Sequence, residues 1–227
     1  MKPTTTVAKT RAPDGAAFVL CRHDGQYVLY MDGRQVMSTT LTHSELLLAD
    51  IGCGFAEPRE KQRVLIGGLG LGYSLRRVLE LSGPRAKVVV AELLPEIVRW
   101  NREHLDGLND DILFDSRSEI REVDVFDLIL KATGSGQQYD SILLDVDDGP
   151  TSLIQPGNFQ IYNRDGLSTL RQALTPGGRV AIWAAGEESR LLKNLRKAGF
   201  KSEEISCAKH PRAKQKIHRI YLGERRD

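Results

Sequence analysis

The chain has 227 residues, of which 41% are hydrophobic and 27% charged, a composition typical of one large α/β globular domain. The formal net charge of +2 gives no bulk argument for binding nucleic acid or a membrane surface. No apolar run is long enough to span a membrane, and the N-terminus lacks the apolar core of a signal peptide. Three scattered cysteines suggest neither a disulfide framework nor a metal site, so a cytoplasmic protein without a bound metal is expected.

The N-terminal part of the chain predicts a small β-structure. Residues 1–14 are polar and contain proline, which predicts a loose arm. Residues 15–41 are predicted to form a β-meander lobe, because short apolar runs alternate with Asp-Gly turn signals. These runs cover residues 17–21, 27–31 and 35–38.

A helix is expected next, over residues 42–51. Thr42 stands at its start and Glu45 three residues later, the spacing of a capping box. From there to residue 227 the chain is predicted to form one nucleoside-binding domain.

The stretch from Val64 to Glu92 has the order strand, glycine loop, helix, strand, acid, which is the first half of a nucleotide-binding βαβ unit. Glycines let the backbone turn sharply and let a ligand approach it closely. The N–H groups at the following helix start favour electron-rich ligand groups. Glu92 ends the second strand, where a carboxylate accepts both hydroxyls of a ribose. The loop glycines are Gly67, Gly68, Gly70 and Gly72.

The glycine spacing narrows the class of ligand. Gly68-x-Gly70-x-Gly72 is tighter than the Gly-x-Gly-x-x-Gly of dinucleotide sites, and no Gly-Lys-Ser/Thr of a P-loop follows. A ribose without a pyrophosphate fits better, which indicates a nucleoside such as S-adenosylmethionine. The alternative is a purely structural tight turn.

Strands and helices alternate through the rest of the chain, which predicts a mostly parallel sheet covered on both faces. Ligands bind such sheets at the carboxyl ends of the strands, near the reversal of strand order. Glu92, Asp124 and Asp145 each end a strand, so they are expected to meet the glycine loop in one crevice. The later strands are expected at residues 118–123, 140–145, 179–184, 201–208 and 216–222, the last two as an antiparallel hairpin.

With these residues in place, the chain resembles the spermidine synthase family and, more broadly, the class I S-adenosylmethionine-dependent methyltransferases. The resemblance covers nearly the whole chain. It implies a Rossmann-like fold, with a mostly parallel seven-stranded sheet whose last strand is antiparallel, preceded by the small meander. The motifs that carry it are MDGRQVMST (31–39), HSEL (43–46), LIGGLGLG (65–72), VVVAE (88–92), VDVF (123–126), ILLDVDDGP (142–150) and LTPGGRVAIW (174–183).

The resemblance also implies roles for individual residues. The glycine loop holds the methionine-derived tail of a donor, which is S-adenosylmethionine or its decarboxylated form. Asp148 is similar to the family's catalytic aspartate, which draws a proton from the attacking amine. The other implied donor contacts are Glu92 and Leu93 at the ribose, Asp124 and Val125 at the adenine, Asp145 beneath the reaction centre, and Gln35 from the N-terminal lobe.

The chain departs from the family pattern around the donor tail and the acceptor. Gly70 stands where the family carries a loop acid that pairs with the donor's amine. His43 replaces a tyrosine of the polyamine tunnel, and Ser44 replaces the His or Gln after it. The nucleoside half of the motif set is intact, whereas the half that defines donor tail and acceptor is altered.

Several residues keep two interpretations. Asp147 and Asp148 are adjacent, so in an extended segment only one faces the donor, and Asp148 is preferred. Asp147, His43 and Glu45 are candidate acceptor residues. The alternatives are that Asp147 is a solvated loop acid, that His43 is a helix-start histidine and that Glu45 completes a capping box. Asp145 alternatively caps a loop. Tyr162 and Trp183 are expected to be packing residues, and the basic segment 209–219 a solvated hairpin loop, because no aromatic platform for nucleic acid accompanies it.

Three functions remain open on this basis. Methyl transfer from S-adenosylmethionine to an amine or another small-molecule acceptor is preferred, because a donor that keeps its carboxylate suits a loop with bare N–H groups and no acid. The second is aminopropyl transfer to a polyamine from the decarboxylated donor. The third is a non-catalytic nucleoside-binding scaffold. A homodimer is expected from the family, and neither nucleic acid nor a membrane is expected as a partner.

Overall fold

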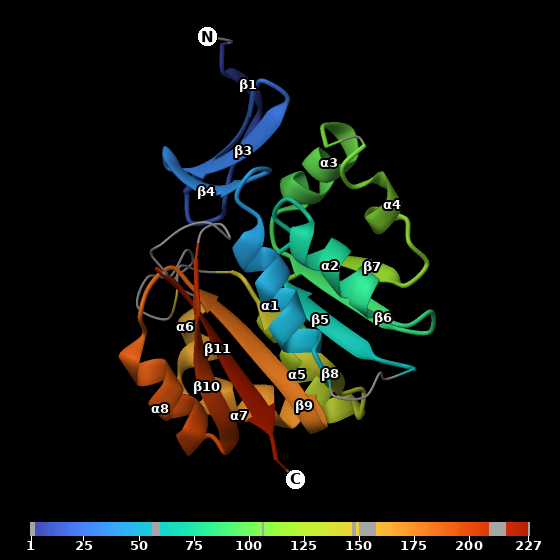
Figure 1. The fold of residues 1–227 in the computed structure, drawn as a ribbon, viewed down its shortest axis with the longest axis vertical. Helices are drawn as coiled ribbons and strands as arrows, with labels where there is room; N and C mark the ends of the chain where they lie inside the picture. Colours follow the sequence, from blue (N-terminus) through green and yellow to red (C-terminus); the bar gives the residue numbers. More distant parts are fainter. Residues whose placement is uncertain are drawn as a thin grey trace.

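The computed structural model describes residues 3–55, 60–105, 107–146, 149, 158–208 and 217–226. The chain forms two sheets, a four-stranded antiparallel sheet at the N-terminus and a seven-stranded sheet in the larger body (Figure 1). The segment between them is helix α1, His43–Cys53. In the described part of the chain, no helix combines the length and the apolar character that crossing a lipid bilayer requires.

The N-terminal sheet has the strand order β1-β2-β3-β4. The three strands expected for the meander are present, but the loose arm expected over residues 1–14 is wrong. Residues 5–11 pair antiparallel with β2, and their threonines and valine favour the extended conformation once a partner strand lies beside them. The strands are β1 Thr5–Arg11, β2 Ala17–His23, β3 Gln26–Met31 and β4 Arg34–Ser38.

A bulge interrupts the pairing of β3 with β4. Leu29 pairs with Met37 and Tyr30 with Gln35, which leaves Val36 as the extra residue. Such a bulge bends its strand and re-aims side chains. Here it lies in the part of β4 that faces the larger body.

The seven-stranded sheet has the order β10-β11-β9-β8-β5-β6-β7, and the expected fold class is confirmed. Strands β5 to β9 pair in parallel, while β11 is antiparallel to both β9 and β10. The order reverses between β5 and β8, which creates the switch point where such sheets bind ligands. The strands are β5 Arg63–Gly67, β6 Lys87–Glu92, β7 Ser118–Glu122, β8 Tyr139–Leu144, β9 Leu174–Ala184, β10 Phe200–Cys207 and β11 His218–Arg225.

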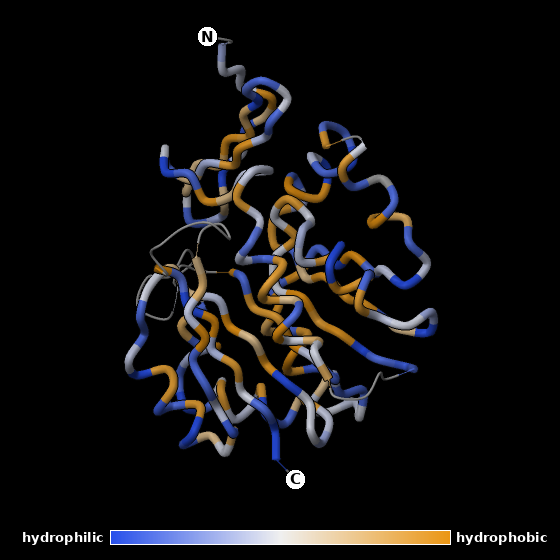
Figure 2. The backbone as a smooth tube through the Cα atoms, viewed as in Figure 1, coloured by the Kyte–Doolittle hydropathy of each residue, from blue (hydrophilic) through white to orange (hydrophobic). Residues whose placement is uncertain are grey.

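Helices cover both faces of this sheet (Figure 1), and its central strands are hydrophobic along most of their length (Figure 2). Val64 and Ile66 belong to a core cluster that includes residues of α1, α2 and α3, whereas Leu65 belongs to the cluster formed with α5, α7 and α8. This alternation is the side-chain period of a strand. The helices after α1 are α2 Tyr73–Leu81, α3 Pro95–Glu103, α4 Asp110–Leu113, α5 Val125–Ser135, α6 Phe159–Tyr162, α7 Arg164–Ala173 and α8 Ser189–Lys197.

Candidate nucleoside-binding site

A cavity of about 600 Å³ lies between the N-terminal sheet and the carboxyl ends of the main strands. The structure brings nine of the residues expected at the site to its wall. Gly67, Gly72 and His43 do not line it, and Asp147 and Asp148 lie outside the described residues. The nine are Gln35, Glu45, Gly68, Gly70, Glu92, Leu93, Asp124, Val125 and Asp145.

Three N–H groups of the glycine loop donate hydrogen bonds to other groups of the protein. Gly68 N–H donates to Ala91 O, Leu69 N–H to Glu92 Oε2 and Gly72 N–H to Leu69 O, each at 2.9 Å. The loop therefore does not offer these three groups to a ligand. This weakens the expectation that bare backbone N–H groups receive a donor carboxylate.

Glu92 connects the end of β6 to the loop. Its carboxylate is buried and accepts hydrogen bonds from the N–H groups of Leu69 and Leu94, one on each oxygen at 2.9 Å. Burial raises the pKa of Glu92, while hydrogen bonds from the neighbouring backbone oppose that rise. Glu92 also lines the cavity, so its carboxyl group lies where a ligand of the site would meet it.

Two further acidic residues, Asp124 and Asp145, line the cavity shortly after the ends of β7 and β8. Asp124 is the N-cap of α5, and its Oδ1 accepts a hydrogen bond from Phe126 N–H at 2.7 Å. Asp145 follows β8, and its N–H donates to Gly67 O at 3.2 Å. A β-carbon on Gly68 would lie 2.9 Å from Asp145 O, so only glycine lets the loop approach this acid so closely.

Two buried asparagines support the loop from behind, and the sequence did not reveal them. Asn101 Nδ2 donates to Gly70 O at 2.9 Å, and Asn109 Nδ2 donates to Leu71 O at 3.0 Å. Asn109 Nδ2 also donates to Asn101 Oδ1 at 2.7 Å, which joins the two amides. Consecutive loop carbonyls are thereby held by α3 and by the residue that precedes α4.

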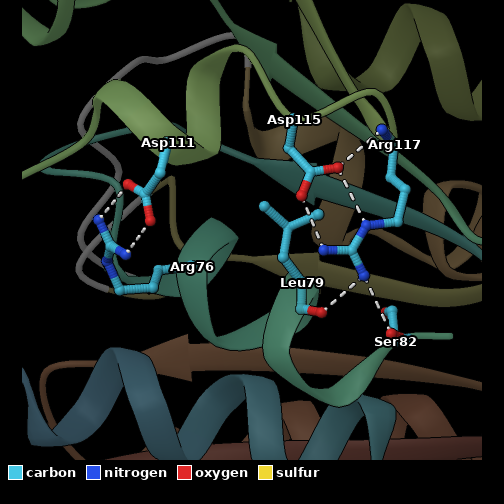
Figure 3. A network of polar contacts seen from close by, with 6 residues as sticks. All are labelled: Arg76, Leu79, Ser82, Asp111, Asp115 and Arg117. Carbon is cyan, nitrogen blue, oxygen red and sulfur yellow. Dashed lines mark hydrogen bonds and ion pairs between the residues drawn. The ribbon is translucent and has the colours of Figure 1, made fainter. Parts of the chain in front are cut away.

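Ion pairs brace helix α2, which begins where the loop ends (Figure 3). Arg76 pairs with Asp111 at 2.8 Å and donates to Leu108 O. Arg117 pairs with Asp115 at 2.7 Å and donates to two carbonyls at the C-terminal end of α2. Both arginines therefore tie α2, the helix after the glycine loop, to the segment around α4.

The N-terminal sheet contacts the loop through Met37. The Met37 side chain lies over Gly70, in the space that a β-carbon there would occupy. Both residues line the cavity. The position at which the resemblance places an acid is therefore a glycine covered by a thioether.

Glu45 is a buried cavity residue and does not complete a capping box. The Thr42 side chain makes no capping hydrogen bond, and the Glu45 carboxyl instead accepts a hydrogen bond from Ser44 Oγ at 2.6 Å. Burial raises the pKa of Glu45, and the Ser44 hydrogen bond opposes that rise. His43 begins α1 away from the cavity wall.

Of the two aromatic residues expected to pack, Tyr162 is buried in the core. Trp183 also packs against the core, but it lines the cavity as well, and its ring meets His218 edge-on at 5.0 Å between centroids. Trp183 lies near the carboxyl end of β9, and this position in the sequence could have indicated that it lines the cavity. Within the described ranges, no group of three or more His, Cys, Asp or Glu side chains has the arrangement of a metal site.

This geometry defines a Rossmann-like α/β fold with a cavity at the carboxyl ends of its parallel strands. No family model matches the chain. It is 29% identical over 127 residues to polyamine aminopropyltransferase 1 of Hyperthermus butylicus, a match that covers 55% of this chain and 41% of the relative. It is 34% identical over 131 residues to polyamine aminopropyltransferase 2 of Streptomyces coelicolor, covering 56% of this chain and 22% of the relative. The chain thus spans less than half the length of these curated relatives.

Solved structures show the same fold. Spermidine synthase from Thermotoga maritima superposes with a TM-score of 0.73 at 14% identity, over 97% of this chain and 72% of that one. A probable spermidine synthase from Corynebacterium glutamicum gives a TM-score of 0.68 at 18% identity, over 99% of this chain and 81% of that one. The chain therefore has the fold of these spermidine synthases, as its motifs indicated.

Proposed function

We propose that this chain is a spermidine synthase-like aminopropyltransferase that uses decarboxylated S-adenosylmethionine and a polyamine or related amine acceptor. The observation that carries the proposal is the charge of the cavity wall. Its described residues include four carboxyl groups, Glu45, Glu92, Asp124 and Asp145, and only one Lys or Arg, which is Arg34. Such a wall attracts cations. The decarboxylated donor carries a sulfonium and an ammonium and no carboxylate, and polyamines are cations.

The names of the curated relatives support aminopropyl transfer in preference to methyl transfer, which gains no support from them. The sequence favours methyl transfer because a glycine loop with free N–H groups suits a donor that keeps its carboxylate. Three of those groups are engaged inside the protein. Methyl transfer remains the second candidate only because Gly70 carries no acid.

The chemistry asks for positioning more than for activation, because the sulfonium is already a good leaving group. The acceptor nitrogen attacks the aminopropyl carbon bonded to sulfur, and the C–S electron pair returns to sulfur, releasing methylthioadenosine. The nitrogen must first be neutral, so a carboxylate that takes or holds its proton assists. We assign that role to Asp148, which lies outside the described residues, with Asp147 as the alternative.

An activity assay with matched variants tests the proposal. The protein is incubated with the decarboxylated donor and putrescine or spermidine, and mass spectrometry follows methylthioadenosine and the aminopropylated product. Asp148→Asn is expected to lower kcat by about 100-fold or more, whereas Asp147→Asn keeps most of the activity. In a parallel incubation with S-adenosylmethionine in place of the decarboxylated donor, formation of a methylated product would contradict the proposal. Donor binding without turnover of any amine would favour the scaffold.

A further inference from the structure

Glu45 is a buried carboxyl group on the cavity wall that has no cationic partner among the residues the structure describes. It lies in the first turn of α1 and is 7% exposed. Its carboxyl group accepts a hydrogen bond from Ser44 Oγ at 2.6 Å, and no Lys, Arg or His of the described chain forms an ion pair with it. Burial without a counter-charge strongly disfavours a carboxylate, so the site is suited to a ligand that brings a positive charge.

Glu45 lies at the end of the cavity that is formed by the glycine loop. Helix α1 packs against α2, and the Glu45 charge is close enough to Tyr73 to raise the pKa of that tyrosine, after burial as the main cause. Tyr73 directly follows Gly72, the last glycine of the loop. Met37, Ser44 and Gly70 line the same cavity. Glu45 therefore lies beside the glycine loop.

We propose that Glu45 binds the ammonium group of the donor's aminopropyl tail. This rests on the proposed function. At Gly70 the loop offers no side chain, and Met37 fills the space above it, so the loop itself supplies no charge for that ammonium. The buried carboxyl on the facing helix supplies it. Glu45 is thus a specificity residue for the donor tail, and its charge selects a tail without a carboxylate.

Calorimetric titration of the wild type and three variants with two ligands tests this. The ligands are decarboxylated S-adenosylmethionine and methylthioadenosine, which shares the nucleoside but lacks the aminopropyl ammonium. Glu45→Gln is expected to raise the Kd for the decarboxylated donor by at least about tenfold and to leave the Kd for methylthioadenosine unchanged. The matched control is Asp50→Asn, which removes a carboxylate from the same helix. Asp50 pairs with Arg77 at 2.7 Å and does not line this cavity, so both Kd values should stay as in the wild type.

Each other outcome overturns the inference in a distinct way. Equal weakening of both ligands by Glu45→Gln would mean that Glu45 supports the nucleoside half. An unchanged donor Kd with a raised acceptor KM would place Glu45 at the acceptor. If the wild type binds the decarboxylated donor and the variant binds it equally well, only this inference fails; if the wild type does not bind it, the proposed function fails too. Glu45→Asp guards against misfolding of the amide variant, because it keeps the charge and should bind the donor better than Glu45→Gln.

Discussion

The side chain of Met37 covers the α-carbon of Gly70, so the N-terminal sheet rests directly on the glycine loop. A bulge in β4 accompanies this contact, since Val36 is left unpaired between the positions of Gln35 and Met37. All three of these β4 residues line the cavity. The small sheet therefore forms part of the cavity wall, and its packing shapes the space above the glycine loop.

The two loop glycines with the tightest surroundings should respond differently to alanine. Gly70 has φ +53° and Gly72 has φ +84°, so alanine at either position costs about 1 kcal/mol in backbone strain. At Gly70 the new methyl meets the end of the flexible Met37 side chain, which can move. At Gly72 it meets the Asn109 amide at 2.8 Å, which is fixed by hydrogen bonds, so the total loss rises to roughly 3 kcal/mol. Urea denaturation of both variants measures this; an equal loss would contradict it.

The asparagine pair should behave as a unit. Asn101→Ala and Asn109→Ala each leave a buried loop carbonyl without its donor, which is expected to lower the free energy of unfolding by about 1–3 kcal/mol. Because the two amides are joined, the double variant should lose less than the sum of the single losses. A double-mutant cycle in urea checks this. Strict additivity would mean that the two side chains act independently.

Two substitutions at Asp124 separate its structural role from its binding role. Asp124→Asn keeps an oxygen for the Phe126 N–H, so α5 stays capped and stability should change little. Asp124→Ala removes the cap and should cost about 1 kcal/mol. Both variants are expected to bind methylthioadenosine more weakly, by about tenfold, because both lose the carboxylate proposed to face the adenine. Unchanged affinity in Asp124→Asn would reduce this residue to a helix cap.

The buried Glu45 carboxyl predicts a particular pH dependence of stability. Its pKa in the folded protein is raised above the ordinary 4.5, so the folded state holds this proton more tightly than the unfolded state does. The wild type should therefore match Glu45→Gln in stability near pH 4 and fall below it as the pH rises through the folded pKa. Tyr73 does not contribute in this range, because its own pKa is raised above 10. Unfolding of both proteins between pH 4 and 8 measures the difference, and a gap that closes with rising pH would contradict the assignment.

Much of the fold follows from local patterns, because strand periodicity, glycine loop and terminal acid occur together in residues 64–92. Glu92 and Asp145 line the cavity, as expected for residues at the carboxyl ends of parallel strands. The strand Thr5–Arg11 was missed because its polar residues become a strand only against β2. A homodimer and the role of Asp148 remain predictions.

The donor-tail end of the site depends on tertiary contacts that no local pattern contains. The Thr42 and Glu45 spacing indicated a capping box, yet burial at the cavity and the Ser44 hydroxyl determine where the Glu45 side chain lies. An absent loop acid suggested free N–H groups, but Leu69 N–H is bound by Glu92 from another strand. The Asn101–Asn109 pair joins a helix to a loop, which two isolated asparagines in a sequence do not reveal.

The most direct test of the account compares the affinity of the wild-type protein for the two forms of the donor. Calorimetric titration with S-adenosylmethionine and with its decarboxylated form isolates the effect of the tail carboxylate, because the two ligands are otherwise identical. A cavity wall with four carboxyl groups should favour the decarboxylated donor by at least about tenfold. Tighter binding of S-adenosylmethionine would contradict the account and make methyl transfer the better explanation.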